Sequence, residues 1–479
     1  MNHLEDTIVA ISTPIGEGGI GIVRLSGKDA IPIADKVFFS PKDRKLRDAK
    51  SHTVVYGFVI DPAKNERIDE VIAMIMKAPK TYTREDVVEI NCHGGMLPLR
   101  ATLQLLLREG ARLAEPGEFT KRAFLNGRID LSQAEAVIDV IRAKTEQAER
   151  LALRQLEGRL SAKITDMRDK VTELCMHIEA YIDFPEDEIE VIEKGDLLDS
   201  MQSIGSELLS ISKRYDEGRF FREGVSTAIV GKPNVGKSSL LNSLLQKDRA
   251  IVTEMPGTTR DVIEDYLNIN GLPLRIMDTA GIRETHDLAE IEGVRRSLKA
   301  IEGADIVLAV LDAGRPFDEA DKEVIDKVKD KRAVIVINKS DIESPALLKI
   351  RDTSHISESI CRKVNANMGC VPNFPIVKVS ALKGDGIDDL KDAIYSLCIT
   401  AGKASDAEDI IITNLRHRQS IDRALKSLKD AEDALKRNEP LEVVALFLRE
   451  SLDSLGEIIG EVTTEDILNK IFSEFCIGK

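Results

Sequence analysis

The stretch Gly231-Lys-Pro-Asn-Val-Gly-Lys-Ser238 decides how the rest of this sequence is interpreted. It fits the pattern Gly-x-x-x-x-Gly-Lys-Ser/Thr, in which glycines let the backbone curl until its N–H groups point at phosphate oxygens. Residues 225–230 have the composition of a buried strand and residues 239–245 that of a helix, the flanks that such a loop needs. A plain glycine-rich turn is the alternative, and these flanks count against it. We therefore expect a phosphate-binding loop, with Lys237 on the β/γ-phosphates and Ser238 on Mg²⁺.

The composition predicts an acidic protein of several domains. The chain has 479 residues, of which 43% are apolar, enough for about three domains with real cores. Its formal net charge is −15, so strong nonspecific binding to nucleic acid is not expected. Any contact with RNA must therefore come from a local patch.

The sequence also predicts a cytoplasmic protein. It contains no apolar run long enough to cross a membrane, and the acidic residues 1–6 lack the charged-then-apolar layout of a signal peptide. The six cysteines include no Cys-x-x-Cys pair, which argues against a disulfide framework and against a zinc site.

The first 118 residues mix short strand-like and helical stretches. Arg24 and Glu89 lie inside two of the strand-like stretches. The pattern alone favours solvent-facing positions for both, because side chains alternate between the two faces of a strand. The strand-like stretches are 7–11, 20–25, 52–60, 71–76 and 87–91.

Helical blocks lie before and after the α/β part that contains the phosphate loop. Apolar residues recur every three or four positions in each block, which is typical of amphipathic helices. We expect the α/β unit to be an insertion and the two blocks to pack as one bundle, since each alone leaves an apolar stripe uncovered. The expected helical stretches are 156–178, 197–211, 421–435 and 441–462. A further short helix, capped by Thr464, should turn Ile467, Ile471 and Phe475 inward.

Three more motifs follow the loop, each at the end of a strand-like stretch. Asp278-Thr-Ala-Gly281 offers an Asp that can hold Mg²⁺ through water and a Gly N–H that can sense the γ-phosphate. In Asn338-Lys-Ser-Asp341, the carboxylate of Asp341 can accept hydrogen bonds from two guanine N–H groups that adenine lacks. Ser380-Ala-Leu382 is a turn suited to backing the base. Because ligands bind at the carboxyl ends of strands in open α/β sheets, the four motifs together predict a GTP-binding unit.

The segment before Asp278 has the character of a switch loop. Gly257-Thr-Thr-Arg-Asp261 is rich in turn formers and hydroxyls, and Thr259 is a candidate Mg²⁺ ligand; a surface turn would explain these residues taken alone. Ile282 stands where a Ras-like GTPase has its water-orienting Gln. Hydrolysis must therefore be assisted differently, and the polar segment after Ile282 includes Glu290.

Taken together, these residues resemble the MnmE (also TrmE) family of tRNA-modification GTPases, essentially from end to end. The motifs that carry the resemblance are the G-unit motifs above and 7–10, 19–24, Tyr82-Thr-Arg-Glu-Asp86, His93-Gly-Gly95, Pro116-Gly-Glu-Phe-Thr-Lys-Arg-Ala-Phe-Leu-Asn126 and Phe475-Cys-Ile-Gly-Lys479.

The resemblance implies a multidomain α+β and α/β fold. Residues 1–118 would form an N-terminal α+β domain that binds tetrahydrofolate and dimerises. Residues 119–218 and 403–479 would form a long helical domain that ends in the Cys-Ile-Gly-Lys tail. Residues 219–402 would form a Ras-like P-loop G domain inserted into the helical domain, the layout that the periodicities also suggest.

The resemblance further implies a K⁺ ion beside the β/γ-phosphates, bound by Asn234, by the carbonyls of Thr253 and Met255, and by Thr258. A fixed monovalent cation there can offset charge in the transition state, as an arginine finger does elsewhere. Glu290 matches the family's water-orienting, catalytic glutamate. The residues expected to bind GTP are Asn234, Val235, Gly236, Lys237, Ser238, Ser239, Thr253, Glu254, Met255, Pro256, Gly257, Thr258, Thr259, Asp278, Thr279, Ala280, Gly281, Asn338, Lys339, Asp341, Ser380, Ala381 and Leu382.

Arg24, Glu89, Arg128 and Lys479 match family positions that contact a 5-formyl- or 5,10-methylene-tetrahydrofolate. A pterin presents N–H donors that suit a carboxylate, and a glutamyl tail suits cations. The family often has Lys at position 128, and Arg keeps the charge with a different geometry. Cys476 matches a family cysteine, for which a chemical role and a small apolar packing role are the two interpretations.

The family's activity implies that this chain is a K⁺-dependent GTPase and a homodimer. With an FAD- and NADH-dependent partner of the MnmG type, in a heterotetramer or larger complex, it would add a carboxymethylaminomethyl or aminomethyl group to C5 of the wobble uridine of certain tRNAs. GTP hydrolysis would drive G-domain dimerisation and a conformational change.

Two other functions share parts of the pattern. A ribosome-assembly GTPase has the same G-domain motifs, but such proteins usually append a basic RNA-binding module, which this sequence does not show. A regulatory dimerisation switch would leave the N-terminal domain and Lys479 unexplained. Neither alternative predicts binding of a reduced folate.

Overall fold

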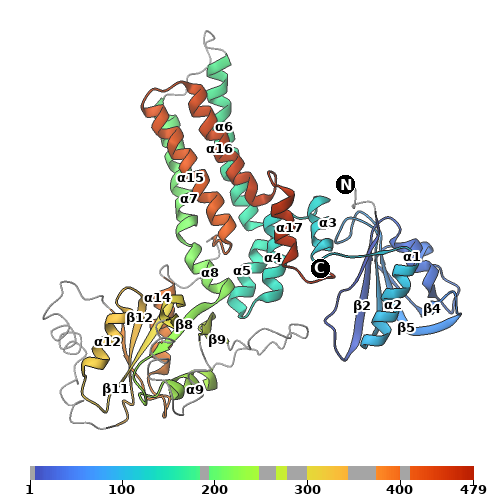
Figure 1. Ribbon diagram of the computed structural model, residues 1–479. Helices are drawn as coiled ribbons and strands as arrows, with labels where there is room; N and C mark the ends of the chain where they lie inside the picture. Colours follow the sequence, from blue (N-terminus) through green and yellow to red (C-terminus); the bar gives the residue numbers. More distant parts are fainter. Residues whose placement is uncertain (1–5, 184–193, 248–265, 278–298, 343–373, 400–409) are drawn as a thin grey trace.

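The computed structural model describes residues 6–183, 194–247, 266–277, 299–342, 374–399 and 410–479. Figure 1 shows three regions: an N-terminal sheet domain, a column of long helices, and a second sheet domain at the lower end of that column. Among the described residues, no helix is both long enough and apolar enough to span a membrane.

The N-terminal domain is built on a seven-stranded sheet of order β3-β4-β5-β6-β2-β1-β7. Helices α1 (Ala30–Val37) and α2 (Met96–Arg108) share one apolar core with the sheet, which leaves the opposite face of the sheet open. The five strand-like stretches expected from the sequence all lie in strands. The strands are β1 Ile8–Ile11, β2 Gly18–Ser26, β3 Phe38–Phe39, β4 Thr53–Asp61, β5 Glu66–Met76, β6 Val87–Gly94 and β7 Arg112–Leu113.

The helical column confirms that the two helical blocks pack as one bundle. Ile164, Leu208, Leu428 and Leu448, one from each of its four long helices α6, α7, α15 and α16, are at most 2% exposed in a shared core. The helices before the insertion are α3 Glu118–Leu125, α4 Leu131–Arg142, α5 Glu146–Leu156, α6 Arg159–Asp183, α7 Lys194–Lys213 and α8 Tyr215–Glu223. Those after it are α15 Leu415–Lys436, α16 Leu441–Ile459 and α17 Glu465–Ser473.

Three details of the expected helices are wrong. The stretch that begins at Leu156 is two helices, because the chain turns at Gly158, whose φ is +86°. Val462 lies beyond the end of α16 and is 46% exposed. In α17, which Thr464 caps as expected, the most buried side chains are Leu468 and Phe472, because that face packs against α4; Ile467 and Ile471 lie beside them and are partly buried.

The second sheet has the order β13-β12-β11-β8-β10-β9, in which every neighbouring pair is parallel except β10 and β9. All six side chains of β8 are buried, as are nearly all of those in β11 and β12, because helices cover a parallel sheet on both faces. Its elements are β8 Val225–Val230, α9 Lys237–Lys247, β9 Tyr266–Ile269, β10 Leu272–Ile276, β11 Ile306–Asp312, α12 Glu319–Val328, β12 Arg332–Asn338, β13 Ile376–Lys378 and α14 Ile387–Cys398.

The inserted unit is joined to the helical column by two adjacent segments. The chain enters through α8, which spans the expected boundary between 218 and 219, and residues 410–414 lead back into α15. A Cβ on Gly218 would lie 2.1 Å from the carbonyl oxygen of Ile412, so only glycine fits there. The α/β unit is therefore an insertion whose two connections touch.

Candidate functional sites

The phosphate loop runs from β8 into α9 with the backbone conformation that its glycines permit. Gly236 has a φ of +93°, and a Cβ there would lie 2.3 Å from Nδ2 of Asn338. Asn234 also takes a left-handed conformation, with a φ of +65°. Ser238 and Ser239 are exposed in the first turn of α9, where a helix N-terminus favours phosphate.

Side chains from the Asn338–Asp341 motif tie the base-recognition loops to the phosphate loop. The Asn338 amide donates to the carbonyl of Val235 (2.9 Å) and accepts from the backbone N–H of Ala381 (3.1 Å). The ammonium of Lys339 donates to the carbonyl of Asn234 (2.7 Å) and to Asp312 (2.6 Å). Three motifs that are far apart in the sequence thus meet at the carboxyl ends of β8, β12 and β13.

The ammonium of Lys237 lies over the loop. It donates to the carbonyls of Gly231 (2.9 Å) and Lys232 (2.8 Å), and burial lowers its pKa. Lys232 is itself fixed by Asp318 and Asp321 at the start of α12, at 2.8 Å each. A cation held within the phosphate cradle suits a β/γ-phosphate.

Asp341 is held in the ionised form that guanine recognition requires. The Ser380 hydroxyl donates to its carboxylate at 2.7 Å, and this hydrogen bond lowers the pKa of Asp341. The carboxylate keeps further lone pairs that can accept from a base. Leu382, in the adjacent turn, is 86% exposed, so its side chain is available to a ligand.

The cation ligands can be tested only in part. Ser238 at the first turn of α9 fits a Mg²⁺ ligand. The carbonyl of Asn234 is taken by Lys339, which leaves the side-chain amide of this exposed residue as the group that could bind K⁺. The predicted residues that lie outside the described part of the chain are Thr253, Glu254, Met255, Pro256, Gly257, Thr258, Thr259, Asp278, Thr279, Ala280, Gly281 and Glu290.

Arg24 and Glu89 face each other across β2 and β6 on the open face of the N-terminal sheet. Their side chains are only 20% and 16% exposed and are joined by a 2.7 Å ion pair. The guanidinium also lies 5.6 Å from the ring centre of Phe119. The solvent-facing interpretation that the strand pattern favoured is therefore wrong, because residues from distant parts of the chain cover this pair.

The C-terminal tail supplies part of that cover. Arg24 donates to the carbonyl of Gly478 (3.3 Å), and the N–H of Phe119 donates to the carbonyl of Lys479 (3.1 Å). Ile477 forms a bridge with Pro116. The structure therefore brings Lys479 to the Arg24–Glu89 pair, as a common ligand site would require.

The other two residues singled out in the N-terminal region lie near this tail. The Arg128 guanidinium lies 4.7 Å from the ring centre of Tyr82, whose hydroxyl hydrogen-bonds that of Thr120 (2.9 Å) on α3. Cys476 is exposed and free, and its carbonyl accepts from the N–H of Gly117 (3.4 Å). Its exposure argues against the apolar packing role.

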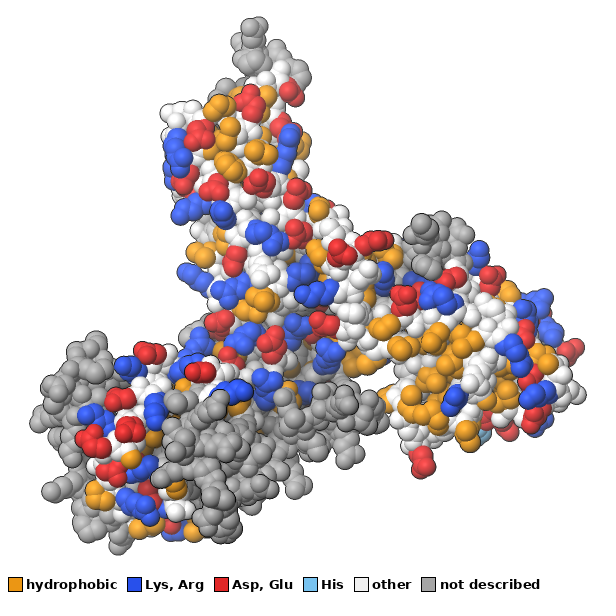
Figure 2. Space-filling model, viewed as in Figure 1, with side chains coloured by type: hydrophobic (Ala, Val, Ile, Leu, Met, Phe, Trp, Pro, Cys, Tyr) orange, Lys and Arg blue, Asp and Glu red, His pale blue; other side chains and the backbone are white. Residues whose placement is uncertain are grey.

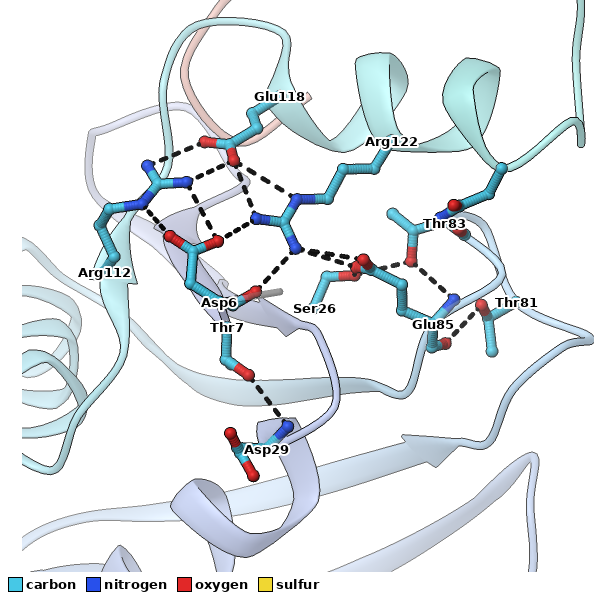
Figure 3. Close-up of polar contacts among 11 residues, drawn as sticks. Asp6, Thr7, Ser26, Asp29, Thr81, Thr83, Glu85, Arg112, Glu118 and Arg122 are labelled. Carbon is cyan, nitrogen blue, oxygen red and sulfur yellow. Dashed lines mark hydrogen bonds and ion pairs between the residues drawn. The ribbon is translucent and has the colours of Figure 1, made fainter. Parts of the chain in front are cut away.

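Sequence reasoning missed the buried guanidinium of Arg122, shown in Figure 3. This side chain is 1% exposed and donates to Asp6 (2.6 Å), Glu118 (2.9 Å) and Glu85 (3.1 Å). Burial alone would raise the pKa values of Asp6 and Glu118, but the hydrogen bonds from Arg112 and Arg122 outweigh it and lower both. The network fixes α3, and with it the N–H groups that hold the tail, against the N-terminal sheet.

Two family models match the chain. The model described as the MnmE helical domain matches residues 131–476, and the model described as the GTP-binding protein TrmE N-terminus matches residues 7–128. The tRNA modification GTPase MnmE of Acetivibrio thermocellus is 48% identical over 477 residues, covering 100% of both chains. The protein of the same name from Bacillus subtilis is 46% identical over 475 residues, or 99% of this chain and 100% of that one.

The search of solved structures finds G domains. That of the T. maritima FeoB iron transporter is 23% identical, covers 36% of this chain and 99% of that chain, and has a TM-score of 0.25. A likeness of this size carries no argument about function.

Proposed function

This chain belongs to the MnmE family of tRNA-modification GTPases, and we propose from this premise that it hydrolyses GTP to modify the wobble uridine of certain tRNAs. The observation that carries the proposal is the junction of three motifs around Asn338, with Asp341 held as a carboxylate by Ser380. A full-length relationship that includes the N-terminal and helical domains disfavours a ribosome-assembly GTPase, which would need to share only the G unit.

The proposed chemistry adds a carboxymethylaminomethyl or aminomethyl group to C5 of the uridine, together with an FAD- and NADH-dependent partner of the MnmG type. A tetrahydrofolate would donate the one-carbon unit. The enclosed pair of Arg24 and Glu89 with Lys479 beside it supports this donor, since it offers a carboxylate to pterin N–H groups and cations to a glutamyl tail. A deletion strain whose tRNA keeps the complete wobble modification would contradict the proposal.

The open face of the N-terminal sheet supports a homodimer. Ile20, Val54, Tyr56 and Ile72, from β2, β4 and β5, are 65%, 58%, 51% and 47% exposed. An apolar sheet face of this kind is typical of an interaction surface, and a second copy of the chain presents the same face. The Arg24–Glu89 pair lies on this face, so a folate bound there would lie near the dimer interface.

Removing the proposed K⁺ ligand should abolish the cation dependence of hydrolysis. We expect the wild-type GTPase rate to rise about tenfold or more when K⁺ replaces Na⁺, because the bound cation offsets transition-state charge. Asn234→Ala should hydrolyse GTP at the same slow rate in both salts, and steady-state phosphate release measures it. Asn242→Ala, the same change at an exposed position on α9, should keep the difference. Equal wild-type rates in both salts would remove the K⁺ assignment and leave the GTPase assignment intact.

Breaking the Arg24–Glu89 pair should abolish folate binding without affecting the G unit. Arg24→Ala and Glu89→Gln are each expected to weaken binding of 5-formyl-tetrahydrofolate by about tenfold or more, since each removes a charged hydrogen-bonding group. Titration calorimetry on the full-length protein measures this loss, and the GTPase rate should be unchanged. Arg100→Ala, on the exposed face of α2, is the matched control. A wild-type chain that binds no reduced folate would favour the two alternative functions.

A further inference from the structure

A cavity of about 1000 Å³ lies where the helical column meets the inserted unit. Its wall comes from α4, α5, α8, the β9–β10 pair, the start of α15, and α17, which Figure 1 shows around the base of the column. Neither the phosphate loop nor the loops that carry Asn338 and Ser380 contribute to this wall. The cavity is therefore separate from the nucleotide site.

The wall of this junction cavity is basic although the chain is acidic. It carries eight Lys and Arg side chains against five Asp and Glu, in a chain whose net charge is −15. Figure 2 shows Lys and Arg side chains among the acidic ones at the base of the column. Several arginines are neutralised by carboxylates, such as Arg222 by Asp139 (2.7 Å) and Arg416 by Glu135 (2.9 Å). Lys470 on α17 has no such partner for its ammonium group among the described residues.

The N-terminus of α15 opens into the same space. This helix is 22 residues long, and its cap Asn414 and first residue Leu415 both line the cavity. The first N–H groups and the dipole of a helix attract anions.

A buried hydroxyl beside this helix end gives an independent reason to expect a ligand. Thr413 is 6% exposed and lines the cavity, and its Oγ1 is buried with no hydrogen-bond partner in the described part of the chain. A buried hydroxyl without a partner costs about 1–3 kcal/mol. An anion at the start of α15 would accept its hydrogen bond.

We propose that the junction cavity binds a phosphate-bearing ligand, which accepts from Thr413 and the start of α15 and pairs with Lys470. This goes beyond the proposed function, because it adds an anion site outside the G-unit motifs. Since its wall includes both the helical column and β9–β10, an occupied cavity would favour the relative placement of column and inserted unit in which these walls face each other.

Inorganic pyrophosphate is the probe, titrated by calorimetry into the full-length Lys237→Ala protein at constant ionic strength so that the phosphate loop does not compete. Pyrophosphate should still bind, and adding Thr413→Val or Lys470→Gln should weaken it about tenfold each. Lys426→Gln, an identical change on the outer face of α15, should have no effect. Thr413→Val should leave the melting temperature of the unliganded protein unchanged or higher, whereas a structural role for the hydroxyl predicts a lower one. No binding to Lys237→Ala, or equal binding by all variants, would overturn the proposal.

A second arm separates two sources of the phosphate group. If tRNA displaces pyrophosphate and its own binding falls in Thr413→Val and Lys470→Gln, the site takes backbone phosphates. If tRNA binding is unchanged in these variants while pyrophosphate binding falls, the natural ligand is a small phosphate compound. Failure of the wobble-modification proposal would show in tRNA profiles and would leave the pyrophosphate result standing.

Discussion

Asp341→Asn is expected to lower the affinity for GTP by at least about 100-fold and to create affinity for xanthosine triphosphate. The Asp341 carboxylate, fixed by Ser380, would accept from the N1–H and the 2-amino group of guanine. An asparagine presents an NH₂ group there, which opposes the guanine amino group and can donate to the C2 carbonyl of xanthine.

The measurement is competition of unlabelled nucleotides against a fluorescent guanine nucleotide, for the wild-type protein and each variant. Asp385→Asn is the matched control, since it is the same change at an exposed position after the Ser380 turn, and its affinities should equal those of the wild type. A wild-type protein that holds ATP as firmly as GTP would refute the assignment of the base pocket. So would an Asp341→Asn variant with unchanged GTP affinity.

Arg122→Ala should destabilise the N-terminal domain by about 3–5 kcal/mol. The substitution leaves Asp6, Glu85 and Glu118 facing one another with most of their compensating charge removed. We expect backbone amides of β1 and α3 to exchange hydrogen at least about 100-fold faster, as mass spectrometry of the intact protein's peptides would show. Arg122→Lys should fall between the two, because it keeps the charge and loses the fork of donors.

The control for this effect lies next to it on the same helix. Lys121→Ala removes a cation whose contact is an exposed hydrogen bond to Asn469, and its exchange rates should stay near those of the wild type. Peptides from the α6–α16 pair should be unaffected in every variant. If Arg122→Ala exchanges no faster in β1 and α3 than Lys121→Ala does, the network is not what holds α3.

The elements of both sheets could be predicted because their signals are local. The strand β8 coincides with the expected residues 225–230, since a central parallel strand is buried on both faces and gives a continuous apolar run. The motifs that begin at Asn338 and Ser380 could be expected beside the phosphate loop because parallel strands bring their carboxyl ends to one edge. The bundle followed from apolar stripes that had no other partner.

The parts that could not be predicted depend on contacts between distant residues. Periodicity places Arg122 in a helix like any surface arginine, and only the folded chain shows three carboxylates converging on it. The cover on Arg24 comes from a residue 454 positions later in the chain, which no local pattern contains. The buried side of α17 is decided by how the helix packs on α4, and the apolar residues at 467, 468, 471 and 472 allow more than one choice.

The close approach of Gly218 to Ile412 has a mechanical consequence for the inserted unit. Two separate strings would let it swing with little correlation between them, whereas two strings pinned together behave as a single stalk. Torque applied at the nucleotide end would then reach α8 and α15 together. The same geometry makes the unit a module for protein engineers, because the cut ends left after its excision already lie within reach of a very short splice.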